Sequence, residues 1–120
     1  MKRACLLLML LVFAGCIDLT TWNLRAQDSP RRIEITAKRF AFNPSEITVK
    51  KGQPVVLAIK SADVSHGLRF RELNLNLKIE KNSSAELPFT PEKTGDFVGH
   101  CSVFCGSGHG QMTLTMHVVN

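Results

Sequence analysis

Residues 94–119 read TGDFVGHCSVFCGSGHGQMTLTMHVV, and this stretch decides the fold of the 120-residue chain. Residues 96–101 and residues 111–119 are predicted to be strands. In the second of these strands one face is apolar and carries Met112, Leu114, Met116 and Val118. The loop that joins the two strands, residues 102–110, is rich in glycine, so its backbone can bend tightly. A loop held by rigid strands at both ends is a common place for a functional site.

The same period-two pattern runs through the chain before this stretch. Apolar and polar side chains alternate from Ile33 to Ala37, as in a half-buried strand, and the alternation continues through Phe40 and Phe42. Further short strands are predicted at residues 47–49, 55–59, 66–70, 73–79 and 85–89. No stretch shows a helical period. Seven or eight short strands separated by Gly and Pro turns predict an all-β Greek-key sandwich.

The first 26 residues have the features of an export signal. Lys2 and Arg3 precede an apolar run, residues 6–17, that is shorter than the roughly 20 residues of a spanning helix. Two processing sites compete: Cys16, in a lipobox-like sequence, could be lipidated, or cleavage could follow Ala26. We therefore predict a signal peptide or lipoprotein tether at residues 1–26. Residues 27–120 would be a functional domain in the periplasm or on the outer face of the membrane.

The charge of this domain is modest. The whole chain has 15 basic and 10 acidic residues, a formal net charge of +5. Without Lys2, Arg3, Arg25 and Asp18, residues 27–120 keep 12 basic and 9 acidic residues. A net charge of +3 fits a solvated surface of mixed sign and gives no reason to predict nucleic-acid binding.

Two of the four cysteines, Cys101 and Cys105, fall in this domain. In an exported protein the simplest interpretation of such a pair is a disulfide. However, His109 and Met112 follow closely, and His66 stands upstream. Thiolates, imidazoles and a thioether suit copper better than calcium, magnesium or manganese, and the thioether favours copper over zinc.

Two kinds of copper site are compatible with these residues. The spacing Cys105-x3-His109-x2-Met112 resembles the ligand loop of mononuclear blue-copper proteins, in which His66 would be the fourth ligand. Cys101 has no role in that site. A second thiolate four residues before Cys105 is what a two-copper site needs, because two thiolates can bridge both metals.

The loop also resembles a known family motif. Residues 101–112, CSVFCGSGHGQM, are similar to the copper A motif C-x-x-x-C-x-x-x-H-x-x-M of cytochrome c oxidase subunit II. Residues 63–68, DVSHGL, resemble the family segment that carries the first histidine, and residues 94–100, TGDFVGH, the strand before the cysteines. The resemblance covers residues 33–119 and implies a cupredoxin-like fold.

This resemblance implies a binuclear copper A centre and a role in electron transport. The implied ligands are Cys101 and Cys105, bridging both coppers, His66 and Met112 on one copper, and His109 and the backbone carbonyl of Val103 on the other. The implied partners are a c-type cytochrome and a haem-copper oxidase. The domain would make and break no substrate bonds itself, whether as part of an oxidase or as a donor to one.

The sequence departs from the family pattern in several places. Val103 stands where the family usually has a Glu that also helps to bind magnesium, and His100 stands where it usually has Gln. We do not find the hairpin of two transmembrane helices, and the only Trp is Trp22, so the aromatic cluster that accepts electrons from cytochrome c is missing. His100 is predicted to be a hydrogen-bonded neighbour of the ligands, and His117 to face solvent.

Other functions would use the same ligands. A mononuclear blue-copper carrier is one, and a periplasmic copper storage or delivery protein is another. Nitrous-oxide reductase has a copper A domain with a similar loop, but it needs a large second domain that we do not expect in 120 residues.

Overall fold

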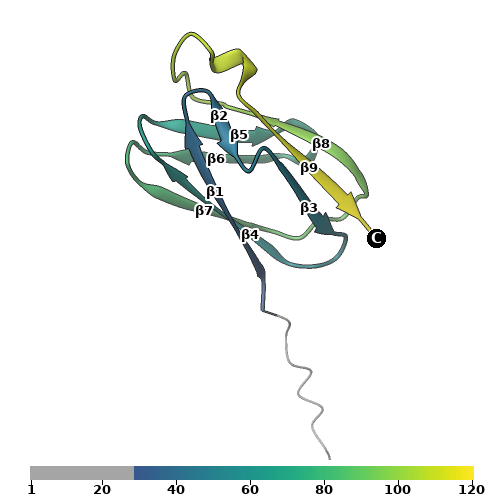
Figure 1. Cartoon of the computed structure of the whole chain (residues 1–120). Helices are drawn as coiled ribbons and strands as arrows, with labels where there is room; N and C mark the ends of the chain where they lie inside the picture. The colour runs from purple at the N-terminus through teal and green to yellow at the C-terminus, as the bar shows by residue number, and fades with distance from the viewer. Residues whose placement is uncertain (1–28) are drawn as a thin grey trace, which may run out of the picture.

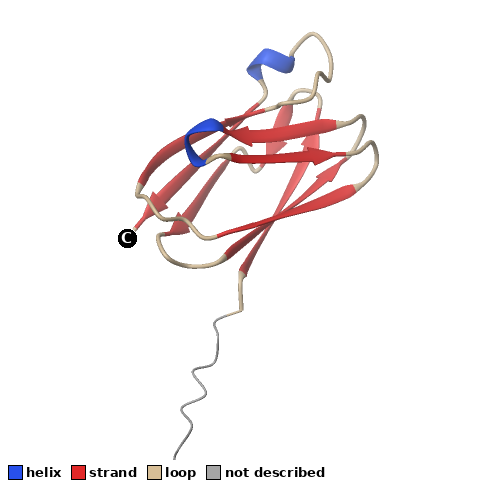
Figure 2. Ribbon diagram, turned by 180° about the vertical axis from the view of Figure 1, so that it is seen from behind, coloured by secondary structure: helices blue, strands red, loops and turns tan. Residues whose placement is uncertain are grey.

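The computed structural model describes residues 29–120, which form two facing β-sheets (Figure 1). One sheet has the strand order β2-β1-β4-β7 and the other the order β3-β9-β8-β5-β6. The strands are β1 (Arg31–Lys38), β2 (Ala41–Asn43), β3 (Glu46–Lys50), β4 (Val55–Ser61), β5 (His66–Phe70), β6 (Leu75–Ile79), β7 (Ser84–Phe89), β8 (Gly95–His100) and β9 (Thr113–Val119). Within this part of the chain the only helical segments are two short 3-10 turns, η1 (Arg71–Leu73) and η2 (His109–Gln111) (Figure 2). The predicted all-β sandwich is confirmed.

The strands pair in both directions. β1 runs parallel to β4 and β3 runs parallel to β9, whereas β5 and β6, and β8 and β9, form antiparallel pairs. Parallel neighbours cannot be joined by a tight hairpin, so the chain must cross over between them. It does so by passing repeatedly from one sheet to the other, as expected for a Greek-key sandwich.

The core lies between the two sheets and follows the alternation seen in the sequence. On β9, Leu114, Met116 and Val118 are at most 4% exposed, while His117 between them is half-buried and faces outward as predicted. From the opposite sheet, Ile35 and Leu57 are almost completely buried. Each such side chain stabilises the folded state by about 1.5–3 kcal/mol relative to an exposed position. The apolar face predicted for the last strand is therefore confirmed.

One expectation about the backbone was wrong. The alternation through Phe40 and Phe42 predicted a continuous strand, but the chain turns after Lys38 and β2 pairs antiparallel with β1. Phe42 is buried in the core, whereas Phe40 is 37% exposed and lies against the loop that follows β8. The two rings have different partners, and spacing alone could not distinguish them.

The predicted export signal, with Cys16 and Ala26, lies outside the residues that the structure describes. Among residues 29–120, no helix has the length and apolar character needed to span a membrane.

The fold brings three chain segments to one end of the sandwich. His66 begins β5, Cys101 follows β8 and Met112 precedes β9. These three strands are neighbours in the order β9-β8-β5. The loop between β8 and β9, which includes η2, projects beyond the strands at the top of Figure 1. Residues that are 35 to 46 positions apart are thereby placed next to one another.

Candidate metal centre

The loop of residues 101–112 is closed at its base and shaped by local hydrogen bonds. The N–H of Cys101 donates to the carbonyl of Met112 at 3.0 Å, which extends the β8–β9 ladder by one step. Within the loop, the N–H of His109 donates to the carbonyl of Gly106 at 3.1 Å and begins η2. These bonds present the side chains of the loop towards β5.

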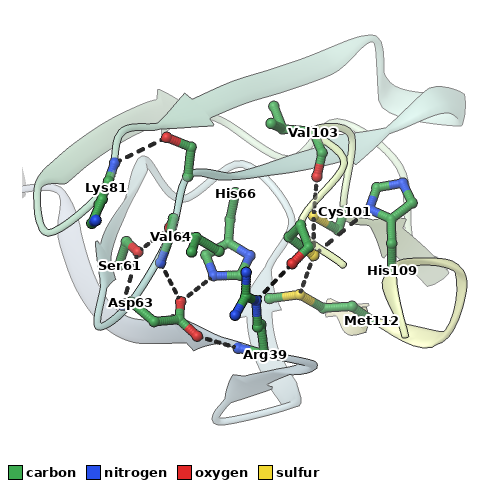
Figure 3. Close-up of polar contacts among 12 residues, drawn as sticks. Arg39, Ser61, Asp63, Val64, His66, Lys81, Cys101, Val103, His109 and Met112 are labelled. Carbon is green, nitrogen blue, oxygen red and sulfur yellow. Dashed lines mark hydrogen bonds and ion pairs between the residues drawn. The ribbon is translucent and has the colours of Figure 1, made fainter. Parts of the chain in front are cut away.

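Four side chains of this loop and His66 of β5, all with sulfur or imidazole donors, converge in one cluster (Figure 3). A ring nitrogen of His66 and the Sγ atoms of Cys101 and Cys105 all lie within 4.8 Å of one another, and all three residues are buried. The Sγ of Cys105 lies 3.7 Å from Nδ1 of His109 and 3.8 Å from Sδ of Met112. The predicted ligand side chains are thus brought together in one cluster.

The backbone carbonyl of Val103 belongs to the same cluster. Its oxygen lies 3.1 Å from Sγ of Cys101 and points into the group of sulfurs (Figure 3). A carbonyl ligand does not depend on the side chain that follows it, so Val103 is compatible with the position predicted for it.

The two thiols are free and their Sγ atoms are 3.8 Å apart, whereas a disulfide bond is about 2.05 Å long. Burial raises the pKa of the Cys105 thiol, and the hydrogen bond with Cys101 raises it further. Without metal the Cys105 thiol therefore keeps its proton at neutral pH. Two soft thiols, two imidazoles and a thioether match the donor preference of copper, and metal binding by a thiol releases its proton.

The tautomer of His66 supports a ligand role. Its Nε2 lies 2.6 Å from Oδ1 of Asp63, while its Nδ1 is the one buried side-chain polar atom of residues 29–120 without a hydrogen-bond partner. Burial alone would raise the pKa of Asp63, but hydrogen bonds from Arg39, His66 and Val64 lower it to about 2. The resulting carboxylate accepts a hydrogen bond from Nε2–H of the ring, which leaves a lone pair on Nδ1. A buried lone pair without a donor is what a metal ligand requires, so the site fits a metal.

Asp63 was missed as a functional residue by sequence reasoning, although it stands in the quoted segment DVSHGL. A carboxylate that holds a ligating histidine is a regular feature of metal sites. The signal that could have identified Asp63 is therefore its spacing of three residues from a candidate ligand.

Arg39 was also missed, and it connects two parts of the site. Its backbone N–H donates to Oδ2 of Asp63 at 2.8 Å, and its side-chain Nε donates to the carbonyl of Cys105 at 2.8 Å. One residue in the β1–β2 turn thus holds both the carboxylate behind His66 and the loop that carries Cys105 (Figure 3). These contacts span 24 and 66 positions, and no local pattern indicates them.

Comparison with known proteins identifies the family. A family model described as the cupredoxin-like domain matches residues 4–114. The chain belongs to the cupredoxin-like family. Cytochrome c oxidase subunit 2 of Thermus thermophilus is 29% identical over 86 residues, which are 72% of this chain and 64% of that subunit. Nitrous-oxide reductase of Cupriavidus necator is 31% identical over 90 residues, 72% of this chain but 14% of that enzyme.

The fold comparison agrees with this assignment. The periplasmic domain of subunit II of cytochrome oxidase of Bradyrhizobium japonicum superposes with a TM-score of 0.67 at 21% identity, over 74% of this chain and 83% of that domain. The predicted resemblance to subunit II is therefore confirmed. The chain spans less than two thirds of the length of the Thermus subunit that it matches.

In this cupredoxin-like domain, glycines let neighbouring segments approach the loop of residues 101–112, called the metal loop below. A Cβ on Gly67 of β5 would lie 2.1 Å from Oγ of Ser102, and one on Gly108 would lie 2.5 Å from the ring of Phe40. Gly106 has a φ of +140°, which side chains rarely adopt. The predicted tight bending of the loop thus has a physical cause: Gly67 of β5 packs closely against Ser102, and the ring of Phe40 packs against Gly106 and Gly108.

His100 does not share the burial of the proposed ligands. It is exposed at the end of β8, and within residues 29–120 its side chain makes no hydrogen bond. It lines a surface depression together with Cys101, His109 and two arginines. Its predicted role as a hydrogen-bonded neighbour of the ligands stays a prediction.

Proposed function

We propose that residues 27–120 form an exported electron-transfer domain that holds a binuclear copper A centre. The observation that carries this proposal is the second thiol. Cys101 and Cys105 are both free and buried, with Sγ atoms 3.8 Å apart, inside a cluster that already contains the donors for a single copper. Two thiolates at this separation are suited to bridging a pair of metal ions.

The ligand assignment follows the resemblance and agrees with the contacts. Cys101 and Cys105 would bridge the two coppers, with His66 and Met112 completing one and His109 and the carbonyl of Val103 the other. When bound, such a centre takes up and releases one electron without large changes in geometry. The short contacts of Cys105 with His109 and Met112, and of Cys101 with Val103, support this set.

The protein's own residues would keep the cluster rigid and dry. Asp63 fixes the ring of His66, and Arg39 ties the loop to that carboxylate. His66 and Met112 are 0% exposed, so water has little access to them. His109 is only half-buried, and the ring of Phe104, 79% exposed, lies 5.7 Å from its ring centroid. His109 is therefore the ligand through which an electron would leave or enter.

The proposed partners are a c-type cytochrome and a haem-copper oxidase. Their support is that the relatives are named cytochrome c oxidase subunit 2. The matched Bradyrhizobium structure is a periplasmic domain, which supports export, and the N-terminal segment or a lipid on Cys16 would attach this chain to the membrane. Whether it works inside an oxidase or as a separate donor, the chemistry proposed for it is electron transfer alone.

A mononuclear blue-copper carrier is the second candidate. Cys105 alone contacts both His109 and Met112, and His66 lies close by, so these four residues could hold one copper without Cys101. A copper storage or delivery protein would use the same residues without rapid electron exchange.

One experiment separates these functions. The purified full chain is loaded with copper, and the metal count and the electron paramagnetic resonance spectrum are recorded. Two coppers per chain with hyperfine coupling shared over both support copper A, and Cys101→Ser should convert the centre to a single blue copper. A single-copper spectrum in the native chain would contradict the proposal. Electron exchange with a cytochrome then separates a carrier from a store, and mass spectrometry of the mature N-terminus separates processing at Cys16 from processing at Ala26.

A further inference from the structure

A depression of about 480 Å³ opens beside the metal centre. Its lining residues are Arg69, Arg71, His100, Cys101, Ser102, His109 and Gly110. Two of these, Cys101 and His109, are proposed copper ligands, so the depression directly adjoins the proposed copper site. The lining contains two arginines and no acidic side chain, so the depression is positively charged.

Arg69, on β5, and Arg71, the first residue of η1, are both exposed. Phe70, between them, is 1% exposed and points into the core, whereas Arg69 and Arg71 are exposed. Arg69 is also the cross-strand partner of His100, which lies immediately before Cys101. The register of β5 and β8 thus places Arg69 beside the site, and Arg71 follows at the start of η1.

These arginines are not neutralised by neighbouring carboxylates. Among residues 29–120, the ion pairs of arginine and lysine involve Arg32 and Lys78, and neither Arg69 nor Arg71 takes part in one. Glu72, the nearest acidic residue in sequence, lines a different cavity. The metal loop itself, residues 101–112, has no Asp, Glu, Lys or Arg. The positive potential at the mouth is therefore available to a partner.

We propose that this depression docks a surface rich in aspartate and glutamate on the protein that exchanges electrons with the centre, an inference that rests on the proposed function. A guanidinium can bind a carboxylate with two parallel hydrogen bonds. Unpaired charges of one sign beside a redox site also steer an oppositely charged partner into place and raise the association rate. The docked partner would lie over His109, the proposed ligand that reaches the surface.

The first measurement uses the isotope-labelled, metal-free full chain under reducing conditions. Hexacyanochromate(III), a redox-inert paramagnetic trianion, is titrated into it and the broadening of amide signals is mapped. Broadening should centre on residues 69–71, 100–102 and 109–110. It should be lost in the double variant Arg69→Gln/Arg71→Gln and kept in Lys50→Gln/Lys51→Gln, which removes the same charge at the far end of β3. Broadening centred elsewhere, or unchanged in the arginine variant, would overturn the proposal.

The second measurement tests the partner. The same labelled protein is titrated with an acidic and, separately, with a basic c-type cytochrome. The acidic cytochrome should perturb the lining residues, and its affinity at low ionic strength should fall about tenfold in the arginine variant but much less in the lysine variant. If the trianion binds as expected but the acidic cytochrome is indifferent to the arginines, the depression is a small-anion site only and the docking proposal is wrong.

Neither measurement needs copper. A copper-loaded chain that fails to exchange electrons would contradict the proposed function. The docking of an acidic protein is tested on the metal-free protein alone. The two failures are therefore distinguishable.

Discussion

At the scale of single residues, the orientation of His66 depends on one carboxylate. Asp63 accepts a hydrogen bond from Nε2–H at 2.6 Å and so leaves the lone pair of the ring on Nδ1, which has no hydrogen-bond partner. Asp63→Ala should weaken copper binding by about 10- to 100-fold, because the ring loses its tautomer and its orientation. Competition with a copper chelator measures this loss. Asp63→Asn keeps an oxygen acceptor and should lose much less copper affinity. Equal losses of affinity in both variants would contradict the orienting role.

Arg39 acts on the same site through the loop backbone. Arg39→Gln removes the hydrogen bond from Nε to the carbonyl of Cys105 but keeps the backbone N–H that binds Asp63. The free energy of unfolding of the metal-free, reduced protein should fall by about 0.5–1.5 kcal/mol, and amide exchange should accelerate around Cys105. Lys38→Gln, an exposed neighbour, is the control for the loss of one charge. Unchanged exchange in the loop would show that the bond does not hold it.

At the scale of elements, the β1–β2 turn packs on the metal loop. A Cβ on Gly108 would lie 2.5 Å from the Phe40 ring, whereas one on Gly110 meets nothing within 4 Å. Gly108→Ala should therefore destabilise the protein by about 1–3 kcal/mol through overpacking. It should also change the copper spectrum, because the loop must shift. Gly110→Ala should change neither the stability nor the copper spectrum. Phe40→Ala, added to the Gly108→Ala variant, should restore part of the lost stability because it removes the overpacked ring. Urea unfolding measures the stability.

The pairing of β8 with β9 has a pH-dependent component. His117 faces Asp96 across the two strands, and their hydrogen bond raises the pKa of His117 above its usual 6.5. A raised pKa in the folded state adds stability below pH 6.5 that is lost as pH rises through the folded pKa. Asp96→Asn should thus lower the melting temperature more at about pH 5.5 than at about pH 9, by a small amount that salt reduces because Asp96 is exposed and His117 is only half-buried. An equal effect at both pH values would contradict this.

At the scale of the whole molecule, the sequence was sufficient to predict features that repeat along the chain or that involve residues close together in it. Period-two alternation predicts the sandwich, and the spacing from Cys101 to Met112 predicts the donor cluster. It was insufficient to predict contacts between residues that are far apart in the sequence. Arg39 meets Cys105 across 66 positions, and the position of Arg69 beside His100 depends on the register of β5 with β8. Register and crossovers arise from packing of the whole chain, which one stretch of sequence does not contain.

The same global coupling predicts that copper stabilises the entire domain. The cluster closes only when β5, β8 and β9 are assembled, so the folded state binds the metal far better than the unfolded chain does. At a free copper concentration about 100 times the Kd, folding should gain about 2.7 kcal/mol, and the melting temperature should rise by about 10–20 °C. Scanning calorimetry of the reduced full chain with and without copper measures this shift, and a chelator should reverse it. The double variant Cys101→Ser/Cys105→Ser should unfold at the same temperature in both conditions. A copper shift that persists in this variant would show that the stabilising site lies elsewhere.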